Sequence, residues 1–381
     1  MSRIMKTKTI AVLLSLSLII LLFSFGNANR TQDNWESGNF QIDVFKIGQG
    51  DSQLIVSPSG KTLLIDVGEL NWNSKKGATY VADKLKEVMG DSFNHIDYVV
   101  ASHLHLDHIG YAGKGGIWAL IEKNGFTIGK LIDRDSAEWV DFDEDEEFDP
   151  QDELFWKNAG TESGTATNWL GYVLDPKNKS KLHREAAKKG SKTQIDLGPE
   201  VVVEIVQSDG LDVKMEDGIK LVSGNHRKEK YLPSENDYSI TLKISYKDLD
   251  YVTGADTDGE YEKSDFGYSY NDVESIIAPL IGEIEILHVN HHGSSHSSNQ
   301  LYLDTLKPLI CLISCGTNSY GHPDQNILDR LLSNSKVYIT EKGDTKRNYK
   351  SSVIVDGDIV IKSSNGINFT VNGDRYSTKT H

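Results

Sequence analysis

The chain has 381 residues, of which 38% are hydrophobic and 25% are charged, and it contains only two cysteines. This composition predicts a globular protein with a large core and excludes a disordered, collagen-like or disulfide-rich chain. The formal net charge of −16 repels polyanions, so a nucleic-acid-binding function would need a local basic groove or bound metal ions.

The first residues predict an export signal. Arg3, Lys6 and Lys8 precede an uncharged apolar stretch, Ile10–Phe25, and small residues at 26–28 follow as a cleavage site. The stretch of about 16 residues is shorter than the roughly 20 that span a bilayer. We interpret residues 1–28 as a signal peptide, with an uncleaved anchor as the alternative. Its removal would leave 37 basic against 56 acidic residues, a net charge of −19, on a secreted or cell-wall-associated protein with no stable membrane span.

The first half of the chain predicts strands and helices after a polar leader at residues 29–39. Alternating or continuously apolar residues predict strands at Phe40–Ile47, Ser52–Ser57, Thr62–Asp66 and Ile96–Ala101. Helical spacing of apolar residues predicts helices at Tyr80–Met89 and within Ile109–Lys123. From about residue 134 to 197 this pattern weakens, which indicates an insertion.

The insertion contains a strongly acidic run, Asp141–Glu153. We interpret the run as a solvated loop rather than a calcium site, because it lacks the spaced ligands and the glycine of an EF-hand. Aromatic residues in this region would either form a cage for a quaternary ammonium group or pack the insertion onto the domain. They are Trp139, Phe142, Phe148, Phe155, Trp156 and Trp169.

The second half repeats the plan of the first. It predicts strands at Val201–Val206, Ser239–Tyr246, Tyr251–Gly254, Ile284–Val289 and Leu309–Ser314. It also predicts helices at Asp272–Ile281 and Gln325–Leu332 and a terminal hairpin at Val353–Ile361. Two such halves around one site predict an α/β fold, a four-layer αββα sandwich over residues 40–362, with a C-terminal tail at 363–381.

The two cysteines, Cys311 and Cys315, lie along and just after one predicted strand. A strand holds such side chains too far apart for a disulfide, so we expect two buried free thiols.

One run of six residues carries the strongest chemical signal. His103, His105, Asp107 and His108 directly follow a predicted buried strand, where loops converge on a pocket. Neutral imidazoles and ionised carboxylates are good ligands for zinc-like ions. A lone histidine would indicate an ordinary core or surface residue, whereas the pattern HxHxDH predicts metal binding.

Further ligands must come from elsewhere, because this short run cannot surround two ions. Asp256 in TGAD, His291 and His292 in NHHGS, and His322 in YGHP each follow a predicted strand beside glycine or another small residue. Asp256 alone also suits a turn and His322 a loop. Together they predict one metal site.

These segments resemble the metallo-β-lactamase superfamily, and more narrowly the hydrolase domain of the bacterial competence protein ComEC and its free-standing secreted relatives. The resemblance extends over about residues 40–361 and departs in the acidic insertion and in the extra Ala255 of TGAD, where such domains usually have TGD. The matching segments are IGQGDSQLI (47–55), KTLLIDVG (61–68), IDYVVASHLHLDHIG (96–110), NDYSITLKI (236–244), TGAD (253–256), VNHHGSSHSS (289–298) and NSYGHP (318–323).

The resemblance implies the metallo-β-lactamase sandwich and two divalent ions, with zinc expected and manganese or iron left open. His103, His105 and one of His291 and His292 would hold one ion, and Asp256 would bridge to the second. The second ion would be held by Asp107, His108 and His322. We favour His292 as the ligand, because in similar phosphorylcholine-esterase domains the second histidine of the pair binds metal and the first faces the substrate phosphate.

The resemblance also suggests roles beyond direct coordination. Asp66 would accept an N–H from a metal histidine and fix its tautomer. Two close cations lower the pKa of a bridging water from about 15.7 to near 7, so a bridging hydroxide would attack without a serine or cysteine nucleophile. Asp107 and Asp256 would then be catalytic as ligands and His291 as a donor to the phosphate or leaving group, while Ser294 and Ser295 would either assist or only shape a turn.

We therefore expect a secreted phosphodiesterase. Its substrate would be DNA, which the ComEC resemblance favours, or a teichoic-acid or choline phosphoester, which the acidic surface favours. A β-lactamase- or lactonase-type C–N or C–O hydrolase is the alternative, weakened because no histidine between Gly110 and Asp256 has a family-like context. A non-catalytic metal-binding module is the third interpretation, and missing ligands would be its sign.

Overall fold

The computed structural model describes residues 34–68, 77–140, 153–160, 163–222, 224, 226 and 228–379. The chain divides into two units, Met1–Asn34 and Trp35–His381, and all that follows concerns the second. The predicted signal peptide and most of the acidic run lie outside the described residues. Within the described part, no helix has the length and apolarity to cross a membrane.

Nine strands form the first sheet, in the order β21-β20-β19-β1-β2-β3-β4-β5-β8. Strands β1, β2 and β3 form the predicted antiparallel meander, and β3, β4 and β5 run parallel. The bounds are β1 Phe40–Val44, β2 Gln53–Val56, β3 Thr62–Ile65, β4 His95–Val100, β5 Thr127–Asp133, β8 Glu185–Ala186, β19 Ile359–Ser363, β20 Asn368–Val371 and β21 Asp374–Ser377.

Seven strands form the second sheet, in the order β18-β17-β16-β15-β12-β11-β9. Strands β12, β15, β16 and β17 run parallel, so their carboxyl ends meet at one edge. The bounds are β9 Val201–Gln207, β11 Thr241–Tyr246, β12 Leu249–Thr253, β15 Ile286–His288, β16 Ile310–Ile313, β17 Lys336–Ile339 and β18 Val353–Ile354.

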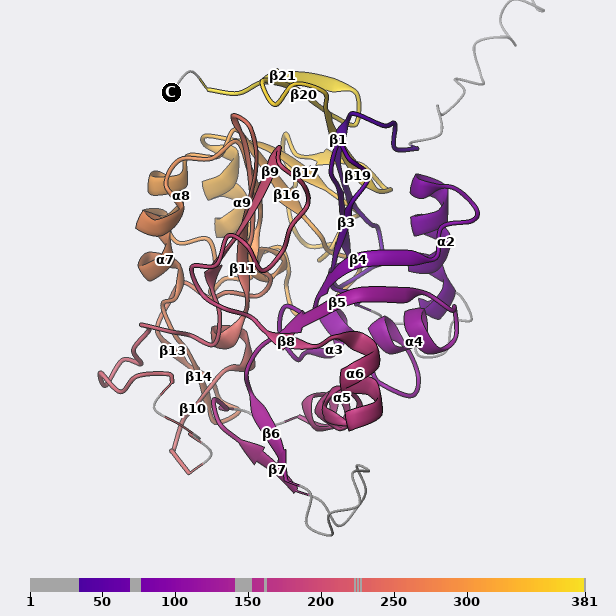
Figure 1. The fold of residues 1–381 in the computed structure, drawn as a ribbon. Coiled ribbons are helices and arrows are strands. Elements are labelled where there is room, and N and C mark those ends of the chain that lie inside the picture. Colours follow the sequence, from indigo (N-terminus) through magenta and orange to yellow (C-terminus); the bar gives the residue numbers. More distant parts are fainter. Residues whose placement is uncertain are drawn as a thin grey trace, which may run out of the picture. The chain divides into compact units, whose positions relative to one another are not determined.

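Helices cover the outer faces of both sheets. Figure 1 shows α2 and α4 on one outer side and α7 and α8 on the other. The helices are α2 Gly77–Met89, α3 Leu106–Ile109, α4 Gly116–Glu122, α5 Gly164–Leu174, α6 Pro176–Leu182, α7 Glu274–Ile281, α8 Gln300–Leu306 and α9 Gln325–Leu332. Smaller elements are the pair β6 Ala137–Val140 and β7 Glu153–Trp156, the sheet of β10 Leu232–Pro233, β13 Glu262–Lys263 and β14 Tyr268–Tyr270, and the 3-10 turns η1 Glu235–Tyr238 and η2 Asn290–Gly293.

Three hydrophobic cores separate the four layers. One lies beneath α2, α4 and α5, one between the sheets, and one beneath α7, α8 and α9. Alternating strand residues divide between them, as the period of two requires. On β15, Ile286 packs between the sheets and Leu287 packs toward the helices, whereas on β2 Ile55 and Leu54 do the same for the first sheet. The predicted four-layer αββα sandwich is therefore confirmed.

The C-terminal predictions are wrong in two respects. Val353–Ile354 and Ile359–Ser363 do not pair as a hairpin, because the first joins β17 in the second sheet and the second joins β1 in the first. Residues 363–381 are not simply a tail, because β20 and β21 extend the first sheet. Each strand finds a longer-range partner that local turn chemistry does not reveal.

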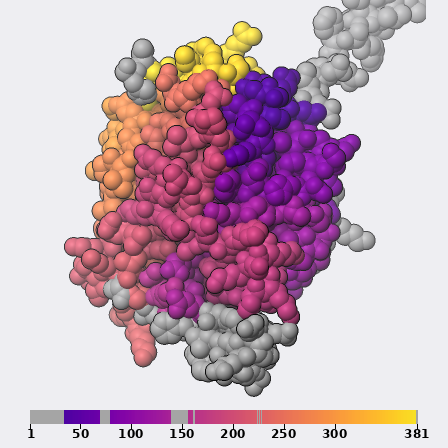
Figure 2. Space-filling view, viewed as in Figure 1, coloured from indigo at the N-terminus to yellow at the C-terminus, as the bar shows by residue number. Residues whose placement is uncertain are grey.

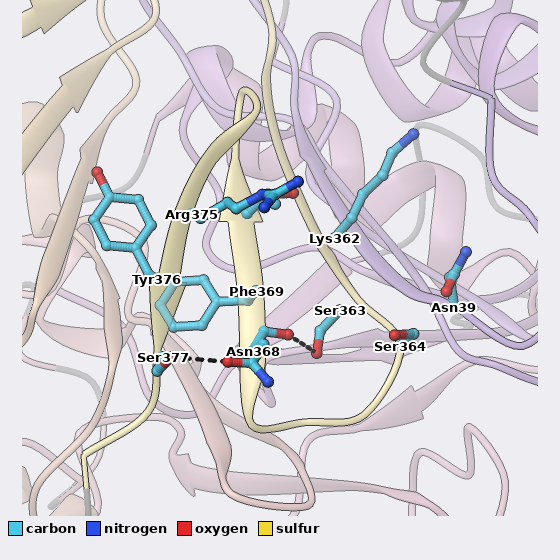
Figure 3. A pocket seen from close by; sticks show the side chains of 10 residues that line it. Asn39, Lys362, Ser363, Ser364, Asn368, Phe369, Arg375, Tyr376 and Ser377 are labelled. Atoms are coloured by element: carbon cyan, nitrogen blue, oxygen red, sulfur yellow. Dashed lines mark hydrogen bonds between the residues drawn. The ribbon is translucent and has the colours of Figure 1, made fainter.

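The β20–β21 hairpin also touches the second sheet. The Tyr338 hydroxyl of β17 lies 2.6 Å from both Asp374 Oδ2 and the Tyr376 hydroxyl of β21. In Figure 2 the C-terminal residues, in yellow, lie at the top of the view, above pink and indigo segments. A cavity of about 580 Å³ lies on this hairpin beside Phe369 and Tyr376 (Figure 3), and no predicted metal ligand lines it.

Phe369→Ala should test whether the hairpin is part of the core. Phe369 is 2% exposed and packs between the sheets, so we expect the free energy of unfolding to fall by about 3–5 kcal/mol, measured by urea unfolding. Ile367→Ala, at a position 48% exposed, is the matched control and should change it by less than about 0.5 kcal/mol. Equal unfolding midpoints for the two variants would contradict docking of the hairpin.

Candidate metal centre

The candidate ligands lie in loops that follow strand ends at neighbouring edges of the two sheets. The HxHxDH run follows β4, Asp256 follows β12, and His291 and His292 lie in η2 after β15. His322 follows β16. The two sheets therefore bring together residues that are more than 200 positions apart in the sequence. Sites at the carboxyl ends of parallel strands are expected in α/β folds.

Four of these residues form one compact group. Single ligand atoms of Asp107, His108, Asp256 and His292 all lie within 4.8 Å of one another. Asp256 Oδ1 is 3.1 Å from His108 Nε2 and 3.5 Å from His292 Nε2. Asp107 Oδ2 is also 3.5 Å from His292 Nε2. Two imidazoles and two carboxylates at these separations can surround one divalent ion.

A second group consists of His103, His105 and Asp256. His103 Nε2 lies 3.1 Å from His105 Nδ1 and 3.8 Å from Asp256 Oδ2. Asp256 thus belongs to both groups and turns a different carboxylate oxygen toward each. The resemblance implied that Asp256 bridges two ions, and Asp256 is the residue that the two groups share.

The partition of the remaining histidines differs from the expected one. His292 groups with Asp107 and His108 rather than with His103 and His105, because its Nδ1 lies 3.0 Å from the Ser314 carbonyl oxygen and its Nε2 faces Asp107. His322 belongs to neither group. Its ring centroid lies 6.1 Å from that of His292, alongside the site.

The donor atoms of the first group fit a divalent cation. His108 Nε2, His292 Nε2 and Asp256 Oδ1 are buried, and none has a hydrogen-bond partner among the described residues. A cation between them would satisfy all three. In the second group, burial lowers the pKa of His103 well below its ordinary value, and nearby His108 and His105 add to this, so its imidazole is neutral and able to coordinate.

Asp66 lies behind the metal-facing side of His108, as predicted. Its Oδ2 is 2.7 Å from His108 Nδ1, and its Oδ1 accepts the backbone N–H of Ser102 at 2.8 Å. An Nδ1–H held by this carboxylate leaves the Nε2 lone pair free to face Asp107 and Asp256.

The two other N-terminal matching segments pack against the same loop. Asp51 N–H donates to the Asp107 carbonyl at 3.0 Å, and Val67 N–H donates to the His108 carbonyl at 2.8 Å. A Cβ at Gly68 would collide with the carbonyl oxygen of Asp107, so the close approach of these chains requires glycine there. The segments IGQGDSQLI and KTLLIDVG therefore support the metal loop rather than supply ligands to either group.

Several residues of the site were not singled out in the sequence. Asp258 Oδ1 lies 2.7 Å from His291 Nδ1, and Asn236 Nδ2 lies 3.2 Å from His291 Nε2. The Tyr270 ring stacks on His296 at 3.9 Å beside them. Asp258 stands two residues after Asp256 and Asn236 stands in a matching segment, so position alone could have suggested both.

The remaining candidates have structural roles. Ser294 is buried and its Oγ accepts the N–H of His296 at 3.4 Å, which is a turn contact. Trp156 and Trp169 are buried in the core beneath α5, so among the described side chains they pack the insertion and form no cage. The side chains of the other four aromatic residues lie outside the described part. Cys311 and Cys315 are buried free thiols, as predicted.

The four-layer sandwich and the two histidine–aspartate groups are the features that the resemblance to the metallo-β-lactamase superfamily implied. The chain is similar to ComE operon protein 3 of Bacillus subtilis (strain 168), with 21% identity over 329 residues. The match covers 83% of this chain but only 34% of that protein's length. This similarity supports the resemblance to ComEC-type domains.

Other comparisons are more distant or shorter. A stretch of 59 residues is 36% identical to recombination protein 2 of Haemophilus influenzae, covering 15% of this chain and 8% of that protein. The solved structures include the metallo-β-lactamase fold protein YhfI of Bacillus subtilis, 13% identical with a TM-score of 0.39, which covers 85% of this chain and 100% of YhfI. Zn²⁺-bound PqqB of Methylobacterium extorquens is 10% identical with a TM-score of 0.42, covering 80% and 98%. No family model matches the chain.

Asp66→Asn should weaken metal binding while the fold survives. Loss of the carboxylate behind His108 should lower the zinc affinity of the apo chain by about 10–100-fold, measured by competition with a chromogenic chelator. Asp97→Asn is the matched control, because Asp97 lies in the same sheet and accepts only from Thr62 in the described contacts. Wild-type zinc affinity in both variants would contradict a metal-supporting role for Asp66.

Proposed function

We propose that the chain is an exported, dinuclear metal-dependent phosphodiesterase. The observation that carries the proposal is the position of His291. Its Nε2 lies 3.8 Å from Asp256 Oδ2, yet His291 belongs to neither ligand group. An imidazole held beside the bridging carboxylate and not used as a ligand is available to the substrate.

Neighbouring residues fix the direction of the His291 ring. Asp258 Oδ1 lies 2.7 Å from Nδ1, which occupies this nitrogen, and Nε2 lies between the Asn236 amide at 3.2 Å and Asp256 Oδ2 at 3.8 Å. From there Nε2 can donate a hydrogen bond to a phosphoryl oxygen or a proton to the departing alcohol. Such general acid assistance typically contributes about 10²–10⁴-fold to the rate.

Two metal-ligating groups that share a carboxylate suit phosphoryl transfer. Divalent ions bound there would lower the pKa of a coordinated water and polarise the phosphoryl group. His103 and His105 would hold one ion, Asp107, His108 and His292 the other, and Asp256 both. His322 would line the approach beside His292.

Two classes of phosphodiester substrate are proposed, DNA and a cell-wall or choline phosphoester. The similarity to a ComE operon protein favours DNA, whereas the net charge of −16 favours a cell-wall teichoic acid or a choline phosphoester over a long polyanion. The apolar segment at residues 10–25 with its preceding basic residues supports export. Zinc is the proposed metal because it is commonly bound by histidine nitrogen and carboxylate oxygen atoms, which are the ligand atoms of both groups.

His105→Ala should abolish hydrolysis, because it removes a ligand from the second group. The purified chain lacking residues 1–28 would be assayed for bound metal and against a chromogenic phosphodiester, single-stranded DNA, a choline phosphodiester and a β-lactam. We expect at least one phosphodiester to be hydrolysed and a loss of about 10³-fold or more in His105→Ala, consistent with the contribution of metal-ion catalysis.

The matched control is His95→Ala, since His95 is exposed at the start of β4 and its Nδ1 lies 2.8 Å from Thr127 Oγ1, away from the ligand groups. Its activity should equal that of the wild type. Hydrolysis of the β-lactam with every phosphodiester untouched would overturn the proposal. Equal activity in His105→Ala would trace the hydrolysis to a contaminant.

His291→Gln should separate leaving-group assistance from metal binding. With an alkyl alcohol as the leaving group we expect kcat to fall by about 10²–10⁴-fold, because that alcohol needs a proton as it departs. With p-nitrophenolate, which departs without a proton, the loss should be much smaller, and zinc content should not change. Equal losses for both leaving groups, together with lost zinc, would identify His291 as a ligand instead.

A further inference from the structure

A buried ion pair lies directly behind the loop that carries His103 and His105. Glu235 Oε1 accepts the backbone N–H of Leu104, the residue between the two histidines, at 3.1 Å. Arg134 grips the same carboxylate with two donors, Nε to Oε1 at 2.7 Å and Nη2 to Oε2 at 2.9 Å. Arg134 is 0% exposed and Glu235 3% exposed, so the pair is shielded from water.

The guanidinium is itself fixed on its other sides. Arg134 Nη1 donates to the carbonyl of Asn158 at 2.7 Å and to Asp209 Oδ1 at 3.2 Å. The Tyr238 ring lies under it at 4.3 Å. Arg134 follows β5 of the first sheet and Asp209 follows β9 of the second, so residues after strands of both sheets hold Glu235 in place.

A second contact from the same segment reaches the loop one residue earlier. The backbone N–H of Ile240 donates to the carbonyl of Ser102 at 2.9 Å. Contacts from residues 235 and 240 therefore flank His103 in the sequence, one at Ser102 and one at Leu104. Any shift of this segment would move the backbone that carries both imidazoles.

Stability alone does not explain such a pair. Replacing a buried ion pair by apolar groups of similar volume is often neutral or stabilising, because the charges must be stripped of water. What apolar groups cannot supply is a charged acceptor at a fixed position for the Leu104 N–H. Metal sites need their ligands held within about 0.5 Å of the working geometry, and a rigid second layer of contacts supplies that precision.

We infer that Glu235, anchored by Arg134, is a positioning residue that sets the spacing of His103 and His105 for metal binding. The inference rests on the proposed role of these histidines as ligands. It predicts that metal affinity depends on the acceptor at residue 235 independently of the stability that the ion pair contributes.

Three variants distinguish the effect of the hydrogen-bond acceptor for Leu104 from the effect of the Arg134–Glu235 ion pair. Glu235→Leu removes the acceptor and leaves Arg134 without this partner, Glu235→Gln keeps one oxygen for Leu104, and Arg134→Met combined with Glu235→Leu makes the whole pair apolar. Each apo chain would be measured for zinc affinity by chelator competition, for the visible spectrum of bound Co²⁺, and for its unfolding midpoint.

We expect zinc affinity to fall by about 10–100-fold in Glu235→Leu and by less in Glu235→Gln. The double variant should regain the unfolding midpoint relative to Glu235→Leu, yet keep the weakened zinc affinity and an altered Co²⁺ spectrum. Recovery of wild-type zinc affinity together with the midpoint would overturn the inference, because the pair would then act only through stability. If the leucine variants do not fold, Glu235→Asp takes their place, because its side chain is one methylene shorter and draws the acceptor back from the Leu104 N–H. Wild-type zinc affinity in Glu235→Asp would then overturn the inference.

The matched control is Glu285→Gln. Glu285 is a fully buried carboxylate that accepts the backbone N–H of Asp250 at 3.1 Å, remote from the HxHxDH loop in the described contacts, so zinc affinity should not change. His103→Ala tests the underlying assignment. Unchanged zinc affinity in His103→Ala would overturn the metal assignment and the inference with it, whereas a loss there with wild-type affinity in Glu235→Leu would overturn the inference alone.

Discussion

The carboxylate of Asp256 is the constraint on which the rest of the site depends. One oxygen lies 3.1 Å from His108 and the other 3.8 Å from both His103 and His291. Burial alone would raise the pKa of Asp256, but the surrounding imidazoles lower it well below its ordinary value, so the group is a buried anion. Isolated buried anions are costly, and this one is tolerable only because cationic or metal-bound partners converge on it from separate loops.

The two sheets bring that convergence about in different ways. The first sheet supplies the HxHxDH loop after β4 and Asp66 after β3, and the second supplies Asp256, His291 and His292 after β12 and β15. Each ligand group therefore combines residues that follow strands of both sheets. Polar contacts behind the loops fix the positions of the ligands that the loops carry. Asp66 holds the His108 ring, and Glu235 holds the backbone N–H of Leu104.

The sequence revealed the parts of this arrangement whose signals are local. Period-two strands and the dense HxHxDH run could be read directly, and the sandwich followed from them. The division of the ligands between the two groups could not be predicted from the sequence. His292 groups with Asp107 because of the orientation of its ring, which the Ser314 carbonyl fixes. The hairpin prediction failed because β19 pairs with β1, which is distant in sequence, while β18 pairs in parallel with β17 in the other sheet. Arg134 and Glu235 are 101 positions apart, so nothing local marks them as a pair.

The pairing of β1 with β19 has a consequence for biosynthesis. Phe40 pairs with Ser363 across the ladder, so one edge of β1 stays uncovered until β19 has been synthesised. Closing so long a loop is entropically slow and gives the chain a high contact order. A chain still on the ribosome thus lacks this partner of β1, and the open strand edge can pair with other chains until β19 has been synthesised.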